Sequence, residues 1–132
     1  FVYEQMSKDA GLVDIDILMS SLQTRAGLIR EWETFLSKYP VLLCPVSGML
    51  PFAQQLDVRS ESDFAAVFDA QLIQRALPTL GLPGLAVATG AKGTTPVGVQ
   101  LISGRFREDI LLAAGKEIEA VVGCPVAADP HD

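Results

Sequence analysis

The chain has 132 residues, which suits one domain or part of one. Its formal net charge is −6 and its basic residues are scattered, so we expect no nucleic-acid partner, which would need clustered Lys and Arg. No apolar run approaches the roughly 20 residues that span a bilayer, so we expect no membrane partner either.

Hydrophobic residues make up 49% of the chain and its mean hydropathy is +0.33. These values are high for a domain with a fully solvated surface, and they suggest apolar surface that faces a further part of a larger protein. The chain begins at Phe1 rather than Met, within a pattern that looks ordered, which favours a processed or truncated chain.

A long amphipathic helix is predicted over residues 14–38. Its apolar residues recur at three- and four-residue steps: Ile15, Leu18, Leu22, Ile29, Trp32 and Leu36. Asp14 is the expected N-cap. The helix should end at Tyr39-Pro40, because the residue before a proline avoids the α region.

The apolar run Val41 to Pro45 predicts a short buried strand. Because it is apolar on both faces, we expect a central strand of a sheet that is covered on both sides. Residues 46–61 show no clear period and predict a long loop, and such loops are often functional.

This loop contains our candidate substrate-binding residues. Ser47 follows the strand directly, and ligands in open α/β sheets lie beyond the carboxyl ends of the strands. Met49 and Phe52 could present apolar surface to a ligand. We predict substrate binding by Ser47, Met49 and Phe52; the competing interpretation is that Met49 and Phe52 pack the loop onto the core.

A second helix should begin at Ser60 or Ser62 and should end or kink at Pro78. Its predicted apolar stripe is Phe64, Val67, Phe68 and Leu72. Two strands over residues 85–89 and 97–102, joined by the turn-rich residues 90–96, predict an antiparallel hairpin. Its expected buried residues are Leu85, Val87, Val99 and Leu101.

A third helix should begin at Glu108-Asp109, where acidic residues suit the dipole, and should end at Gly123. Its predicted stripe is Ile110, Ala114, Ile118 and Val122, with Leu111 and Val121 beside it. The tail, residues 125–132, is expected to be poorly ordered. Three strands and three helices do not readily close a doubly covered sheet, so the pattern indicates the edge of a larger α/β sheet.

The residues alone indicate no self-sufficient active site, and we predict no catalytic residue in the chain. The only histidine, His131, lies in the tail, and no Gly-x-Ser-x-Gly elbow occurs. Lys92 is expected in water, and Ser103 is expected to be a turn residue. Cys44 and Cys124 form no metal-binding motif, so two buried thiols, no metal and no cofactor are expected; a disulfide between the two stays open.

Three segments in a fixed order resemble the C-terminal part of the amidase signature family, whose members are Ser-cisSer-Lys hydrolases of carboxylic amides. They are Tyr39 to Pro45, Gly81 to Val87 and Pro96 to Ile102, followed by a helix with Phe106, Asp109 and Leu111-Leu112. The resemblance runs from about residue 25 to residue 120. Pro40 and Thr89 depart from the family pattern, which obscures the substrate class.

The resemblance implies an α/β fold in which residues 1–132 form the C-terminal segment of an amidase-like domain. That segment would be part of a mixed β-sheet covered by helices, and incomplete alone. The catalytic serines and lysine of the family would lie in an earlier part of the polypeptide, because no Gly-Gly-Ser-Ser run occurs here. The implied partners are the remainder of the amidase chain and a small-molecule amide substrate.

The implied function is cleavage of carboxylic amide C–N bonds by the full-length parent, with this segment supplying sheet and pocket walls. One alternative is the amidase component of a tRNA-dependent amidotransferase, and another is a non-catalytic scaffold or interaction module. A cytoplasmic location fits best, and a homo-oligomer stays open.

Overall fold

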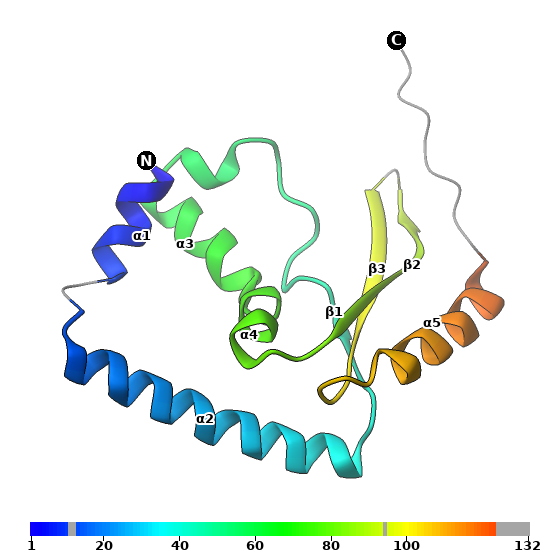
Figure 1. Cartoon of the computed structure of the whole chain (residues 1–132). Helices are drawn as coiled ribbons and strands as arrows, with labels where there is room; N and C mark the ends of the chain where they lie inside the picture. Colours follow the sequence, from blue (N-terminus) through cyan, green and yellow to red (C-terminus); the bar gives the residue numbers. More distant parts are fainter. Residues whose placement is uncertain (11–12, 94, 124–132) are drawn as a thin grey trace.

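A computed structural model of the chain describes residues 1–10, 13–93 and 95–123. The helices are α1 (Val2–Ala10), α2 (Ile15–Lys38), α3 (Glu61–Ala70), α4 (Leu72–Leu80) and α5 (Glu108–Val122), with a short 3-10 turn η1 (Leu56–Val58). The strands are β1 (Leu42–Pro45), β2 (Gly84–Lys92) and β3 (Thr95–Ile102). Figure 1 shows the strands and α5 at one end of the molecule and α1 with the start of α2 at the other.

The three strands form one antiparallel sheet in the order β1-β3-β2. The predicted hairpin is therefore confirmed, but its loop is shorter than predicted. β2 runs on to Lys92 through an irregularity between Ala88 and Gly90, and β3 begins at Thr95, so most of residues 90–96 is paired. The prediction that β1 is a central strand is wrong for this sheet, because β1 pairs with β3 alone among the described strands.

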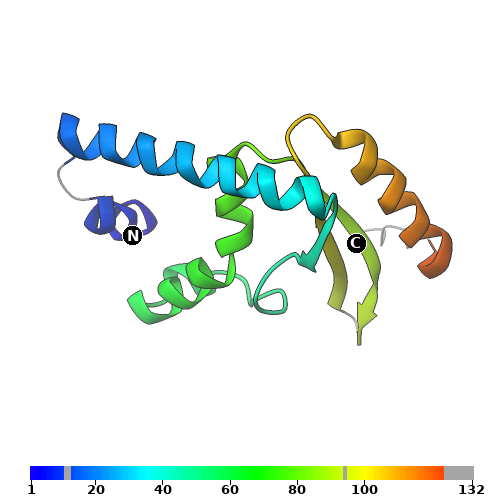
Figure 2. The same ribbon diagram turned by 90° about the horizontal axis from the view of Figure 1, so that it is seen from below.

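Apolar clusters lie on both faces of the sheet, and Figure 2 shows helices on either side. On one face, Leu111 of α5 packs with Val87 and Leu101. On the other, α2 and α4 supply Leu36, Leu77 and Leu80, which pack with Leu82 and Ile102. Of the four residues predicted to be buried in the hairpin, Val87 and Leu101 are buried, whereas Leu85 and Val99 are half-buried.

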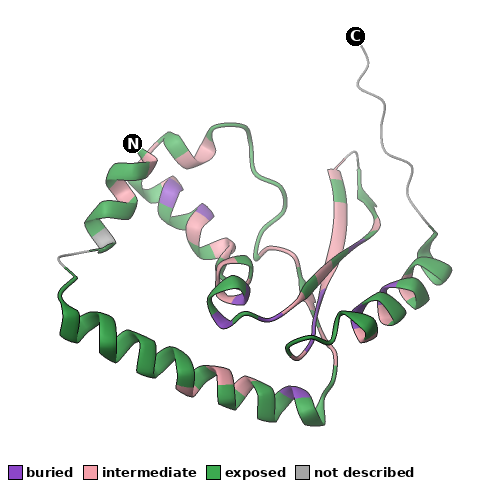
Figure 3. Ribbon diagram, in the orientation of Figure 1, coloured by how far each residue is buried: buried purple, intermediate pink, exposed green. Residues whose placement is uncertain are grey.

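The predicted long helix is confirmed as α2, and Asp14 caps it by accepting a hydrogen bond from the backbone N–H of Ile17 at 2.8 Å. Its apolar stripe is only partly covered. Leu36 is buried and Ile29 and Trp32 pack against the same cluster, but the stripe residues of the first two turns are exposed: Ile15, Leu18 and Leu22. Figure 3 shows this change from the exposed to the partly buried half.

Two helices replace the predicted second helix. Ser60 is the N-cap of the first of these helices, α3, and its hydroxyl accepts a hydrogen bond from the backbone N–H of Asp63 at 3.1 Å. Phe64 and Val67 of the predicted stripe are buried. The helix does not end at Pro78, because Pro78 lies inside α4, which ends at Leu80 with Gly81 as its C-cap; that Pro78 kinks the helix stays a prediction. The break falls at Gln71 instead.

A hydrogen-bond competition explains that break. In a continuous helix the carbonyl of Ala70 would accept from the N–H four residues later. Here it accepts from the backbone N–H of Gly48 at 2.8 Å and from the hydroxyl of Ser47 at 3.3 Å. The loop after β1 thus donates the hydrogen bonds to the Ala70 carbonyl that a continuous helix would have supplied.

The third predicted helix is confirmed as α5, but its stripe is rotated by about one residue. Leu111 and Gly115 are buried, Ala114 and Ile118 pack against the cluster, and Val121 and Val122 are exposed. At Gly115 an added Cβ would lie 2.6 Å from a Leu85 methyl carbon, so the glycine allows close contact with the sheet. The prediction for the tail, residues 125–132, and those for Cys124 and His131 lie outside the described residues.

An additional helix, α1, precedes the first predicted element. Lys8 of α1 forms an ion pair with Glu61 of α3 at 2.6 Å, and the rings of Phe1 and Phe64 meet edge to face. The hydrogen bond from Lys8 lowers the pKa of the Glu61 carboxyl, although both groups are exposed.

Candidate functional site

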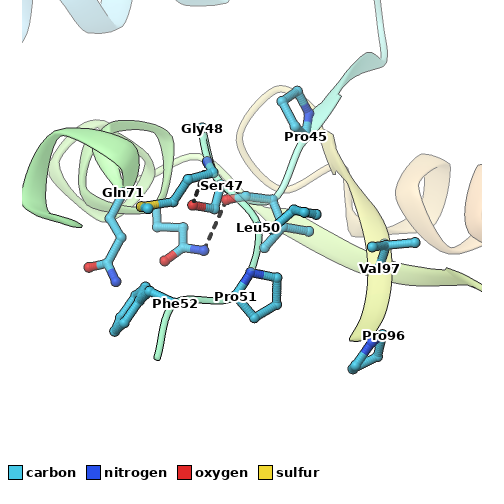
Figure 4. Close-up of a pocket in the computed structure, with 13 residues that line it drawn as sticks. Pro45, Ser47, Gly48, Leu50, Pro51, Phe52, Gln71, Pro96 and Val97 are labelled. Atoms are coloured by element: carbon cyan, nitrogen blue, oxygen red, sulfur yellow. Dashed lines mark hydrogen bonds between the residues drawn. The ribbon is translucent and has the colours of Figure 1, made fainter. Parts of the chain in front are cut away.

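A pocket of about 590 Å³ lies where β1 ends, beside the start of α4 and the start of β3. Figure 4 shows how the loop after β1 wraps around it, with Pro96 and Val97 of β3 on the opposite side. The lining residues are Pro45, Val46, Ser47, Gly48, Met49, Leu50, Pro51, Phe52, Gln71, Gln74, Pro96, Val97 and Gly98.

Hydrogen bonds that involve its backbone groups fix the first half of this loop. The carbonyl of Ala70 accepts from the N–H of Gly48, and the Gln74 side chain donates to the Val46 carbonyl at 2.9 Å. A Cβ at residue 48 would lie 3.4 Å from Ala70 backbone atoms, so the loop lies close against the α3–α4 junction. The wall that it forms is positioned before any ligand arrives.

The hydroxyl of Ser47 is part of this anchor. It donates to the carbonyl of Ala70 at 3.3 Å and accepts from the backbone N–H of Met49 at 3.3 Å. A hydroxyl used in this way holds the loop, and it has no general base beside it among these contacts. The geometry therefore gives Ser47 a structural role in the pocket wall rather than that of a nucleophile.

The lining is predominantly apolar, and none of its described residues carries a charged side chain. Proline, methionine, leucine, phenylalanine and valine side chains make up most of it, as is usual for small-molecule pockets. Its polar side chains are Ser47, Gln71 and Gln74. Ser47 and Gln74 already donate hydrogen bonds to backbone carbonyls. The wall suits a neutral, largely apolar group.

All three predicted site residues thus line one pocket, with Met49 and Phe52 each 37% exposed. That they bind a substrate stays a prediction. Sequence reasoning missed Gln71, Gln74 and the start of β3, because these reach the pocket through the helix break and the sheet register. For the β3 side of the pocket, the one sequence signal is the turn-rich run before Val97. By itself this run predicts only a loop between the two hairpin strands that is longer than the observed one.

Two other side chains that the sequence brings to notice lie away from the pocket lining. Ser103 is 1% exposed; its hydroxyl donates to the Pro40 carbonyl at 2.7 Å and its N–H to the Pro83 carbonyl at 3.3 Å. It is a buried connection between three segments rather than a simple turn residue. Lys92 is exposed at the end of β2, consistent with a solvated amine.

Cys44 of β1 is half-buried, with its sulfur 3.5 Å from the Gln100 carbonyl oxygen, and burial raises the pKa of its thiol. Among the described residues, no group of three or more His, Cys, Asp or Glu side chains is placed to hold a metal ion. Within the same residues, no helix combines the length and the apolar character needed to cross a membrane.

Comparisons with known proteins extend over most of this structure. The chain is 34% identical over 119 residues to the indoleacetamide hydrolase of Bradyrhizobium japonicum, a match that covers 89% of this chain and 26% of the relative. It is 35% identical over 119 residues to the indoleacetamide hydrolase of Bradyrhizobium diazoefficiens, covering 89% of this chain and 23% of that relative. No protein-family model matches the chain.

A solved structure of 6-aminohexanoate cyclic dimer hydrolase superposes with a TM-score of 0.69 at 18% identity, over 92% of this chain and 28% of that one. The fold of this chain is therefore shared with part of that structure. These similarities point to the amidase signature family.

Two further facts concern a second kind of relative and the share of each relative that the chain covers. One component of the glutamyl-tRNA(Gln) amidotransferase of Streptococcus pyogenes serotype M5 is 29% identical over 99 residues, which covers 75% of this chain and 20% of that relative. The similarity is weaker than that to the hydrolases. The chain spans about a quarter of the length of the curated hydrolases that it matches.

Proposed function

We propose that the chain is part of a hydrolase that cleaves carboxylic amide C–N bonds, and that the pocket beyond β1 forms one wall of its substrate site. The supporting observation is the pocket itself: a preformed, uncharged, apolar wall at the carboxyl end of a strand in an amidase fold. Ligand pockets are mostly lined by apolar side chains with a few polar groups, as this one is. The hydrolase relatives supply the reaction class.

In this proposal the chain shapes the site and does not perform the chemistry. The family resemblance implies that a serine oxygen attacks the amide carbonyl, that the C–N bond breaks as the leaving amine takes a proton, and that water then releases the acid. The serine and its lysine relay would come from the remaining part of the longer polypeptide. Met49 and Phe52 would contact the group attached to the carbonyl.

The second candidate is the amidase component of a tRNA-dependent amidotransferase, which the similarity to the Streptococcus pyogenes relative supports. The higher identity to the hydrolases, 34% against 29%, favours the hydrolase.

The polypeptide that the gene encodes can be tested directly. It should release ammonia or amine from aryl and aliphatic amides when purified alone. Activity that requires copurified proteins would support the amidotransferase instead. No turnover of either class would support a non-catalytic scaffold. Cytoplasmic location and homo-oligomerisation remain predictions.

A further inference from the structure

The side chain of Gln71 is the polar group of the pocket that the fold itself does not use. The other two polar side chains of the described lining, Ser47 and Gln74, form hydrogen bonds with backbone groups that hold the loop after β1. Within residues 1–10, 13–93 and 95–123, Gln71 forms hydrogen bonds through its backbone alone. In Figure 4 the dashed lines, which mark hydrogen bonds between the lining residues, do not reach Gln71.

The backbone of Gln71 is fixed on both sides. Its N–H donates to the Val67 carbonyl at 3.2 Å, and its carbonyl accepts from the N–H of Arg75 at 3.1 Å. The carbonyl of Ala70, directly before it, accepts from the N–H of Gly48 in the anchored loop. Only the side-chain torsions of Gln71 therefore have to be ordered when a ligand binds, which limits the entropic cost of a contact.

The chemistry of this side chain defines what it can select. A glutamine amide donates through its NH₂ group and accepts through its oxygen. Gln71 is half-buried and shares the lining with apolar side chains such as those of Met49 and Phe52. A ligand that displaces water from this amide must replace the lost hydrogen bonds, or binding is weakened. A hydroxyl group replaces them, whereas a hydrocarbon group does not.

We propose that Gln71 determines specificity: its side-chain amide hydrogen-bonds an uncharged polar group, such as a hydroxyl, on the acyl part of the substrate. The substrate class is then an amide whose largely apolar acyl group carries one such polar group. This inference rests on the proposed function, because it takes the pocket to be a wall of the amide-hydrolase site. Gln71 selects the substrate and takes no part in breaking the C–N bond.

Paired substrates test the proposal in the proposed full-length hydrolase. The probes are 3-phenylpropanamide and its two forms with a ring hydroxyl at the meta or the para position. All three release ammonia, so one assay measures them. At least one hydroxylated amide should have a kcat/KM about 2- to 10-fold above that of the parent amide, as expected for one partly exposed hydrogen bond. If neither exceeds the parent amide, the proposal is wrong.

A substitution assigns the preference to one side chain. Gln71→Met removes the donor and the acceptor but keeps the length of the side chain, so the kcat/KM ratio of hydroxylated to parent amide should fall to about one or below. Gln23→Met is the matched control, because Gln23 is an exposed glutamine of α2 outside the pocket lining, and the ratio should not change. If Gln71→Met does not fold, Gln71→Ala provides the same comparison, and the paired substrates still decide with the unsubstituted protein.

The results distinguish failure of this inference from failure of the proposed function. Hydrolysis of all three amides, with a ratio that is the same in the unsubstituted and the Gln71→Met proteins, would contradict the role of Gln71 alone. No release of ammonia from any amide by the unsubstituted protein would contradict the proposed function, and the role of Gln71 with it.

Discussion

At the residue scale, Ser103 shows how a single hydroxyl can connect three segments. It is buried at the end of β3, donates to the carbonyl of Pro40, and its N–H reaches the carbonyl of Pro83. We expect Ser103→Ala to lower the free energy of unfolding by about 0.5–1.5 kcal/mol, because a part-buried hydrogen bond is lost. Urea denaturation measures this. Ser37→Ala, at an exposed site on α2, should change stability by less than about 0.5 kcal/mol; equal effects would contradict the assignment.

Glycine positions offer a second residue-scale test with a built-in control. At Gly98 an added Cβ would lie 2.7 Å from the Val87 carbonyl oxygen, a backbone atom that cannot move aside cheaply. Gly98→Ala should therefore destabilise the hairpin. At Gly27, within α2, the nearest atom is 4.0 Å away, so Gly27→Ala should stabilise the helix by about 0.5–1 kcal/mol. Thermal unfolding of the two variants should show shifts of opposite sign, and shifts of the same sign would show that the register around Gly98 is wrong.

Substitution of the pocket residues distinguishes two roles, substrate binding and packing of the loop onto the core. In the proposed full-length hydrolase, Met49→Ala and Phe52→Ala should change the ratio of kcat/KM between bulky and small amides, because selectivity reflects differential binding of transition states. Stability should change little, since both side chains are partly exposed. Lost stability with an unchanged ratio would mean that these side chains only pack the loop onto the core.

At the element scale, local signals predicted most of the elements, α1 excepted, and tertiary contacts set their limits. Asp14 and Ser60 cap helices as their side chains suggest, and the hairpin follows its apolar pattern. The break at Gln71 could not be predicted, because it depends on the Ala70 carbonyl bonding to a loop more than twenty residues earlier. The stripe of α5 was misplaced because the pattern counted Val122 and ignored Gly115.

The hairpin strand β3 carries the element-scale prediction. Leu101 is 2% exposed and joins Val87 and Leu111 in the cluster beneath α5. Leu101→Ala should lower the free energy of unfolding by about 2–5 kcal/mol, since a buried leucine leaves a cavity when it is truncated. The melting temperature measures the change. An unaltered transition would show that α5 does not pack on this face.

At the scale of the whole molecule, the sequence predicted the family, the fold class and one side of the pocket. Ser47, Met49 and Phe52 could be identified because they follow a strand with an unmistakable apolar run. Gln71 and Val97 could not, since they reach the pocket only when the α3–α4 break and the register of β3 are known.

The most direct test of this account is a comparison of amide turnover by two proteins. Purified residues 1–132 should give only background hydrolysis of aryl and aliphatic amides, because the chain carries pocket walls without the nucleophile that the family resemblance implies. The full-length hydrolase proposed above should hydrolyse the same amides. Turnover by the isolated 132 residues that survives repurification and is blocked by a serine-directed reagent would contradict the account.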